Sequence, residues 1–462
     1  MEKNTQQRKF GFITTVAMIV GIVVGSGIFF KTPQIMERVG GNILMGGAVF
    51  LVAALGIIFG GLTVSLYAQK NDLVGGIITY SEMAWGKTVG YLAGWFQMVF
   101  YFPAICAVIA WAAANYTCAL FGLPNLLVNG TFGYEVWVIT LAYLLGVYAI
   151  NCFATMAAGK FQNIAMFVKL GALAVISIGG LIKGDAVGAI TSSASTPVSS
   201  TGFLSALIVV IFAFDGWMVA PSIAHEIKNP KRNLPLALMI APLMITAVYL
   251  AYFLGASALV SPEQLASGTD PLQIVATKLF GDIGMKVIMI FVIISVLGTL
   301  NGLVLGYIRL PYALAVRKEI RKSDLIGKMH PKFGIPVVSV LLTLCLILLW
   351  CVLHFLSIDG PQFGFTLLKG LEVDNLPIVL TYLFNGALYV AILVKGMKGT
   401  KLSFVQRFVF PSLALIGAGL IIYGGIIQPK FNVYFIICCL GILAGWLLKP
   451  RAKKGTLPEN PS

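Results

Sequence analysis

Two short stretches place flexible and polar residues where a long apolar segment would otherwise continue. The first runs from Gly21 to Phe29 (GIVVGSGIF), where three glycines and a serine interrupt an apolar run. The second runs from Phe212 to Trp217 (FAFDGW), where an acid and a glycine do the same. Each glycine costs about 1 kcal/mol of helix propensity relative to alanine, so both stretches predict helices broken midway. Close helix packing through small residues is the alternative for the first stretch.

A broken helix has chemistry that an unbroken helix lacks. Its freed N–H groups attract a carboxylate, and its freed carbonyl groups accept hydrogen bonds from an ammonium group. Two breaks lying side by side would therefore fit the two charged ends of a zwitterion. The apolar residues around the breaks indicate that this chemistry takes place inside a membrane, where broken helices line ligand sites.

Lys169 is a charged residue within an apolar segment. A lysine in a membrane helix costs about 3 kcal/mol on insertion scales unless it finds a partner or reaches the interface. Its position near one end of the expected span 161–182 allows the side chain to extend to the interface. A specific partner inside the protein is the other interpretation.

The composition requires a lipid environment. The 462 residues are 58% hydrophobic and 11% charged, with a mean hydropathy of +0.93, whereas soluble domains carry about 25% charged residues. Apolar runs near the roughly 20 residues needed to cross a bilayer recur along the whole chain. We expect twelve spans at 11–34, 43–69, 86–119, 133–156, 161–182, 203–226, 236–260, 284–315, 335–357, 376–397, 407–427 and 431–449.

The distribution of charge predicts the orientation. Of the 32 lysines and arginines, 24 fall at the termini and on the loops of one side, 7 on the opposite side, and one, Lys169, inside a span. By the positive-inside rule the basic side is cytoplasmic, so both termini are expected there. The net charge of +15 is thus explained by membrane orientation rather than by nucleic acid. The basic stretch 317–336 should form a short surface helix attracted to anionic lipid.

The seven cysteines have no metal-ligand spacing, so we expect no metal and no cofactor. The two expected breaks lie five spans apart, as in an inverted repeat of five plus five helices. A membrane-embedded enzyme would need clustered His, Cys or acidic residues, and a channel would need a polar stripe or a filter sequence. Neither pattern is evident, so both remain remote alternatives.

Several motifs resemble the amino acid–polyamine–organocation superfamily. They are Gly25-Ser26-Gly27-Ile28-Phe29, the FAFDGW run, Asn229-Pro230, and Leu300-Asn301-Gly302 leading to Arg309 and Tyr312. Within it, the chain resembles the L-amino acid transporter family, including bacterial serine/threonine and alanine/serine/cysteine exchangers, over essentially its whole length. The resemblance implies an all-α LeuT-like fold with twelve transmembrane helices and broken helices 1 and 6. Its parts would be a cytoplasmic N-terminus 1–10, repeats 11–182 and 203–397, helices 11 and 12 in 407–449, and a cytoplasmic tail 450–462.

The resemblance also implies roles for individual residues. Amides near Ser26 would bind a substrate carboxylate, while nearby carbonyls would face its ammonium group. Phe212 matches an aromatic gate that closes over the substrate, with ordinary packing as the alternative. Asp215 stands where the family often has glycine, which leaves helix capping and proton transfer both open. The implied binding set is Val23, Gly25, Ser26, Gly27, Phe212 and Asp215.

Lys169 matches a family lysine that bridges spans 1 and 8, roughly where sodium-coupled relatives hold an ion. Its ammonium group would donate to carbonyls near Gly21 and to the hydroxyl of Ser295. Tyr249 would help to couple it to the moving helices, with ordinary packing as the alternative. A permanently charged Lys169 implies exchange, whereas a lysine that titrates implies proton-coupled symport.

The resulting expectation is a sodium-independent exchanger of small neutral L-amino acids, working by alternating access in the plasma membrane of a bacterium. A proton-coupled symporter is the alternative. The partners are small L-amino acids and the lipid bilayer. A heavy subunit linked by a disulfide is not expected, because the loop 120–132 has no cysteine.

Overall fold

The computed structural model describes residues 10–25, 27–70, 76–125, 132–153, 155–218, 221, 227–261, 263–264, 271–331 and 335–450. Helices make up nearly all of this part of the chain, and only isolated bridging pairs break the pattern. The first half contains α1 (Phe12–Val23), α2 (Gly27–Arg38), α3 (Ile43–Lys70), α4 (Gly76–Trp85), α5 (Lys87–Phe96), the π-helical turn η1 (Gln97–Tyr101), α6 (Phe102–Leu120), α8 (Tyr134–Phe153), α9 (Thr155–Lys183) and α10 (Ala186–Ser193).

The second half continues with two long helices and then a series of single spans. These elements are α11 (Ser200–Ala213), α13 (Pro230–Ser257), α15 (Pro271–Val316), α16 (Ser323–Ile326), α17 (Val337–Ile358), the 3-10 turn η3 (Gly360–Phe363), α18 (Asn375–Lys395), the π-helical turn η4 (Val405–Val409), α19 (Phe410–Ile426) and α20 (Phe431–Leu448).

Ten helices of the described residues are long and apolar enough to cross a membrane, or eleven if the bent pair α1 and α2 forms one span. The chain is therefore a multi-pass membrane protein. The helix α11 is apolar but has only 14 residues. Each of the twelve expected spans overlaps a helix or a helix pair, and the exact count of twelve stays a prediction.

The structure adds detail to several expected boundaries. The long helix α15 is two helices joined at Gly281, whose φ of +69° is outside the helical region, so its apolar part begins near the expected residue 284. The expected surface helix after Arg317 is α16. The helices α4 and α10 lie in segments that we expected to be loops, and α10, with 8 residues, packs on α3 and α13.

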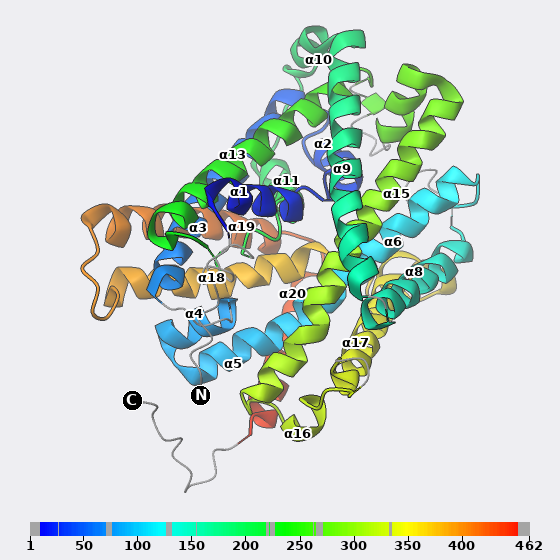
Figure 1. Ribbon diagram of the computed structural model, residues 1–462. Helices are drawn as coiled ribbons and strands as arrows, with labels where there is room; N and C mark the ends of the chain where they lie inside the picture. Colours follow the sequence, from blue (N-terminus) through cyan, green and yellow to red (C-terminus); the bar gives the residue numbers. More distant parts are fainter. Residues whose placement is uncertain are drawn as a thin grey trace, which may run out of the picture.

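The two halves of the first broken span lie in the middle of the bundle together with α11 (Figure 1). The helix α1 packs mainly on α13, and α2 packs mainly on α11. Around them, α3, α9, α13, α15 and α18 form the surrounding layer. The broken helices are therefore shielded from lipid by unbroken ones, as the unsatisfied backbone groups of a break require.

Small residues allow the surrounding helices to approach closely. A Cβ atom on Gly180 of α9 would lie 2.1 Å from the carbonyl oxygen of Gly255 on α13, and one on Gly255 would lie 2.7 Å from the carbonyl oxygen of Ser177. The backbones of α9 and α13 are thus in direct contact. Such contacts drive association where lipid provides no hydrophobic force between helices.

We expect Gly180→Ala to destabilise the protein by about 1–3 kcal/mol, because a methyl group at this contact must push two helices apart. The matched control is Gly171→Ala on the same helix, where an added Cβ meets nothing within 4 Å. This control should be neutral or slightly stabilising, since alanine favours helix. Thermal unfolding of the purified protein in detergent measures both, and equal midpoints for the two variants would contradict the contact.

Candidate transport site

The first break separates α1 from α2. The helix α1 ends at Val23, α2 begins at Gly27, and the two axes differ by 58°. Val24 has an extended backbone, and a Cβ atom on Gly25 would lie 3.0 Å from the side-chain oxygen of Thr299 on α15. Glycine is therefore favoured by tight packing as well as by the break. Ser26 lies outside the described residues.

The second break follows α11. This helix ends at Ala213, and residues 214–218 form turns. Gly216 has a φ of +100°, which side chains disfavour, and a Cβ atom there would also lie 3.0 Å from Ile22 of α1. The two breaks are neighbours, because a Cβ atom on Gly27 would come within 2.9 Å of the Cα of Ala213.

Lys169 satisfies one carbonyl group at the end of α1. Its Nζ atom donates to the carbonyl oxygen of Gly21 at 2.6 Å, and only 2% of the residue is exposed. The side chain therefore does not reach the membrane interface. A Cβ atom on Gly21 would lie 2.7 Å from the sulfur of Met166, so the backbone of α1 lies against α9 here.

The expected hydrogen bond between Lys169 and Ser295 does not form. Ser295 is fully buried on α15, and its Oγ atom has no hydrogen-bond partner among the described residues. In this conformation Lys169 therefore connects α9 to α1 but not to α15, whereas the resemblance implies both contacts.

Tyr249 joins the ends of both broken helices. Its hydroxyl group lies 3.0 Å from the carbonyl oxygen of Val23 and 2.8 Å from that of Ala213. The residue is fully buried on α13. The carbonyl oxygens of Val23 and Phe212 each have a partner within the protein, since Phe212 accepts from the amide of Asp215 at 3.2 Å. Each carbonyl oxygen has a second lone pair with which to accept from a ligand.

Asp215 follows the second break and has a partner that the sequence did not predict. Its carboxylate accepts a hydrogen bond from the hydroxyl group of Tyr101. Tyr101 is the last residue of η1, so a π-helical turn in the third span determines where this hydroxyl lies. Turns of this kind are frequent at functional sites. An aromatic residue in an apolar segment gave no signal of this role.

Phe212 lies next to a second buried lysine. Its ring packs edge-on against Phe30 at 5.4 Å between centroids, and the Nζ atom of Lys31 lies 4.5 Å from its centroid. Lys31 is fully buried in α2. The charge tally, which counted Lys169 as the one basic residue inside a span, was therefore wrong, because Lys31 also lies within the expected span 11–34.

Ion pairs connect α2 to the segment that leads into α18. Lys31 pairs with Asp374 and also donates to the side-chain oxygen of Asn375 at 3.1 Å. About two helical turns further along α2, Arg38 pairs with Glu372. The sequence places Asp374 just before the expected span 376–397, but nothing in the sequence indicated that Lys31 is its partner.

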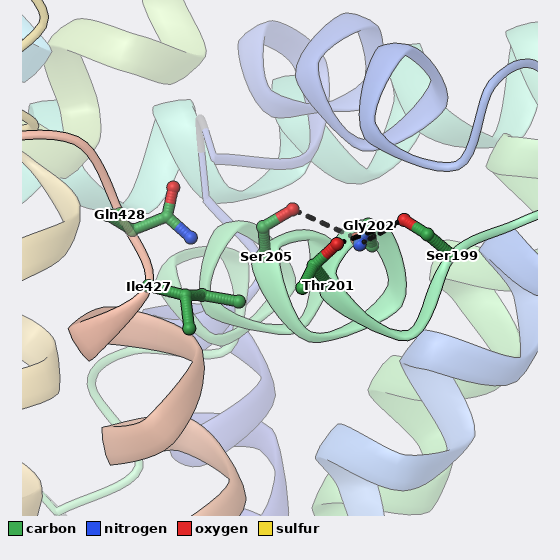
Figure 2. A pocket seen from close by; sticks show the side chains of 6 residues that line it. All are labelled: Ser199, Thr201, Gly202, Ser205, Ile427 and Gln428. Atoms are coloured by element: carbon green, nitrogen blue, oxygen red, sulfur yellow. Dashed lines mark hydrogen bonds between the residues drawn. The ribbon is translucent and has the colours of Figure 1, made fainter.

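A polar cavity of about 270 Å³ opens at the other end of α11 (Figure 2). The 14 residues of α11 place it roughly 20 Å from the break at Ala213. It is therefore separate from the two breaks. Arg38 contacts its wall by donating to the carbonyl oxygen of Ser205 and the side chain of Gln428. The lining residues are Ser199, Thr201, Gly202, Ser205, Ile427 and Gln428.

A bundle of membrane helices with two adjacent broken helices at its centre defines a transporter with a LeuT-like fold. The chain belongs to the amino acid permease family, whose profile matches residues 10–449. The family is one of transporters, not enzymes, and amino acid transport is the activity it supports.

Three relatives illustrate the range of the family. The serine/threonine exchanger SteT of Bacillus subtilis is 28% identical over 449 residues, which cover 96% of each chain. The human cystine/glutamate transporter is 26% identical over 82% of this chain and 75% of its own. The methylthioribose transporter of Bacillus subtilis is 24% identical over 70% of both. Relatives with such different substrates do not determine the substrate of this chain.

Lys169→Ala should slow amino acid transport roughly tenfold or more, a loss of about 1.4 kcal/mol or more in the transition state, while substrate affinity changes little. The reason is that the lysine contacts the backbone of α1 below the break rather than the expected ligand position. Lys183→Ala is the matched control on the same helix, since Lys183 donates to a carbonyl outside the site, that of Leu279. Rates and half-saturating concentrations in proteoliposomes measure both. A variant as fast as the unmodified protein would show that Lys169 has no part in the transport cycle.

Proposed function

We propose that the protein is a sodium-independent exchanger of small neutral L-amino acids that works by alternating access. The observation that carries the proposal is the hydrogen bond from Lys169 to the carbonyl group of Gly21, beside the first break. A fixed ammonium group at this carbonyl does what a bound sodium ion does in sodium-coupled relatives, because both supply positive charge to the freed end of a helix.

The substrate backbone would bind between the two breaks. The carboxylate would accept from the amides at the start of α2, around Gly25, Ser26 and Gly27. The ammonium group would donate to the second lone pairs of carbonyls such as those of Val23 and Phe212. A zwitterion matches this pair of ends in charge and in hydrogen-bonding capacity.

Neutral side chains are favoured by the surroundings of the site. The carboxylate of Asp215, the acid adjoining the breaks, is engaged by Tyr101, and the neighbouring Phe212, Phe214 and Trp217 are apolar and buried. The relative SteT of Bacillus subtilis, a serine/threonine exchanger, supports this substrate class. Proton-coupled symport is the second candidate, because the Asp215–Tyr101 pair is a titratable group beside the site.

Alternating access requires a closure at each end of the site. We assign one closure to Phe212 together with the ion pairs of Lys31 and Arg38, since these hold α2 to the segment before α18. At the other end, the amide of Lys228 donates to the carbonyl oxygen of Phe10 at 2.8 Å and ties the start of α1 to the chain beyond the second break. Tyr249 would transmit movement between the two broken helices.

The cellular setting follows from the distribution of charge. The excess of lysine and arginine on one side favours cytoplasmic termini by the positive-inside rule. The bacterial relative from Bacillus subtilis supports the plasma membrane of a bacterium as the location. Transport would not need a heavy subunit linked by a disulfide, because Cys118, the cysteine nearest the loop 120–132, is buried.

The transport mode can be tested in proteoliposomes loaded with unlabelled L-serine. Entry of labelled L-serine should require the internal amino acid and should be unaffected by replacing sodium with choline, because Lys169 supplies the positive charge. Empty vesicles with an acidic exterior test the alternative. Uptake into empty vesicles driven by the pH gradient would replace exchange by proton symport, and a sodium requirement would remove the argument from Lys169.

The proposed closure can be tested by reversing a charge pair. Lys31→Asp and Asp374→Lys should each slow exchange strongly, because breaking a buried ion pair costs about 3–5 kcal/mol, and the double variant should recover part of the rate. The reversal of Arg38 and Glu372, the second ion pair of the same closure, is the comparison. Its side chains are 19% and 15% exposed, against 0% and 14% for the first pair, so its single variants should be milder. Failure of the double variant to exceed both single variants would contradict a role for the pair itself.

A further inference from the structure

An apolar groove lies between α8 and α17, away from the transport site. It has a volume of about 430 Å³, within the range of small-molecule sites. The helices α8 and α17 each pack on α6 and α15 rather than chiefly on each other, which leaves the groove open between them. The lining residues are Leu145, Tyr148, Ala149, Cys152, Phe153, His330, Ile335, Val337, Val340, Leu341 and Leu344.

The groove has a buried floor and exposed walls. Tyr148, Cys152 and Val340 are at most 8% exposed, whereas Leu145 and Leu341 are 53% and 55% exposed. Both helices are membrane spans by length and composition. An open apolar groove on such a surface faces the hydrocarbon of the bilayer, so a lipid chain is the molecule at its entrance.

Positive charge gathers at one end of the groove. His330 belongs to its lining, and the segment 317–331 just before it carries five lysines and arginines against two acids. Two of these cations are paired, Arg317 with Glu82 and Glu319, and Lys318 with Asp324. The other three, Arg321, Lys322 and Lys328, are exposed and have no ion pair with the described residues. Basic segments beside apolar clefts attract anionic lipid head groups.

We propose that this groove is a binding site for an anionic phospholipid. One acyl chain lies between α8 and α17, and the phosphate group lies against Lys328 and its basic neighbours. A second copy of the protein fits less well, because a symmetric contact would bring two identical basic rims together. The site does not depend on the substrate or on the transport mode.

Native mass spectrometry of the protein in detergent, titrated with dioleoylphosphatidylglycerol or dioleoylphosphatidylcholine, tests the proposal. The unmodified protein should retain one phosphatidylglycerol roughly tenfold more tightly than phosphatidylcholine. Ala149→Trp should weaken this binding by a similar factor, because Ala149 is exposed within the groove and a large ring fills it. Lys328→Gln should reduce the preference for phosphatidylglycerol while phosphatidylcholine binds as before.

Matched controls separate the groove from general effects. Ala142→Trp adds the same ring to α8 two turns earlier, outside the groove, and Lys401→Gln removes an exposed charge from another loop. Both should bind phosphatidylglycerol like the unmodified protein. Three results would overturn the proposal: unchanged lipid binding by Ala149→Trp, equal binding of the two lipids by the unmodified protein, or a change in oligomeric state instead of lipid retention in Ala149→Trp.

Discussion

The arrangement of the whole bundle follows from the need to satisfy carbonyl groups that two broken helices leave free inside a membrane. In hydrocarbon no water can donate to the free carbonyl groups at a helix end, so each of these groups needs a donor from the protein or from a ligand. Here the donors are Lys169 on α9 and Tyr249 on α13. Both helices therefore contact α1, and their own contact through Gly180 and Gly255 keeps them together.

The same requirement explains why charges are so sparse and so local in the interior. Within the described part of the chain, the fully buried lysine is Lys31, and it meets an acid, two amide side chains and two aromatic rings. A charge taken out of water costs several kcal/mol unless it is paired and hydrogen-bonded. Buried lysines thus occur where the protein supplies partners: Lys31 has several, and Lys169 has the carbonyl group of Gly21.

The sequence predicted the features that rest on local patterns and missed those that rest on contacts between distant segments. Glycine clusters and apolar length were enough to locate the break after Val23 and the break after Ala213. The contact of Lys169 with Gly21 followed from the family resemblance. The hydrogen bond between Tyr101 and Asp215 was not predictable, because it depends on the π-helical turn η1. Such a turn contains about one extra residue, and no residue type in the sequence marks it. Lys31 was not singled out because its partner, Asp374, lies 343 residues further along the chain, and only the structure brings the two together.

Tyr249 has one hydroxyl proton and two carbonyl oxygens within reach. A single proton makes one good hydrogen bond at a time, so one helix end is always less well satisfied than the other. The carbonyl oxygen that does not receive the proton keeps a lone pair to which Tyr249 cannot donate. An N–H group of a bound ligand can donate to the carbonyl group that lacks a donor. The hydroxyl group of Tyr249 is then free to donate to the other carbonyl group. Because one hydroxyl serves both carbonyl groups, a ligand that donates to either helix end changes the hydrogen bonding of both.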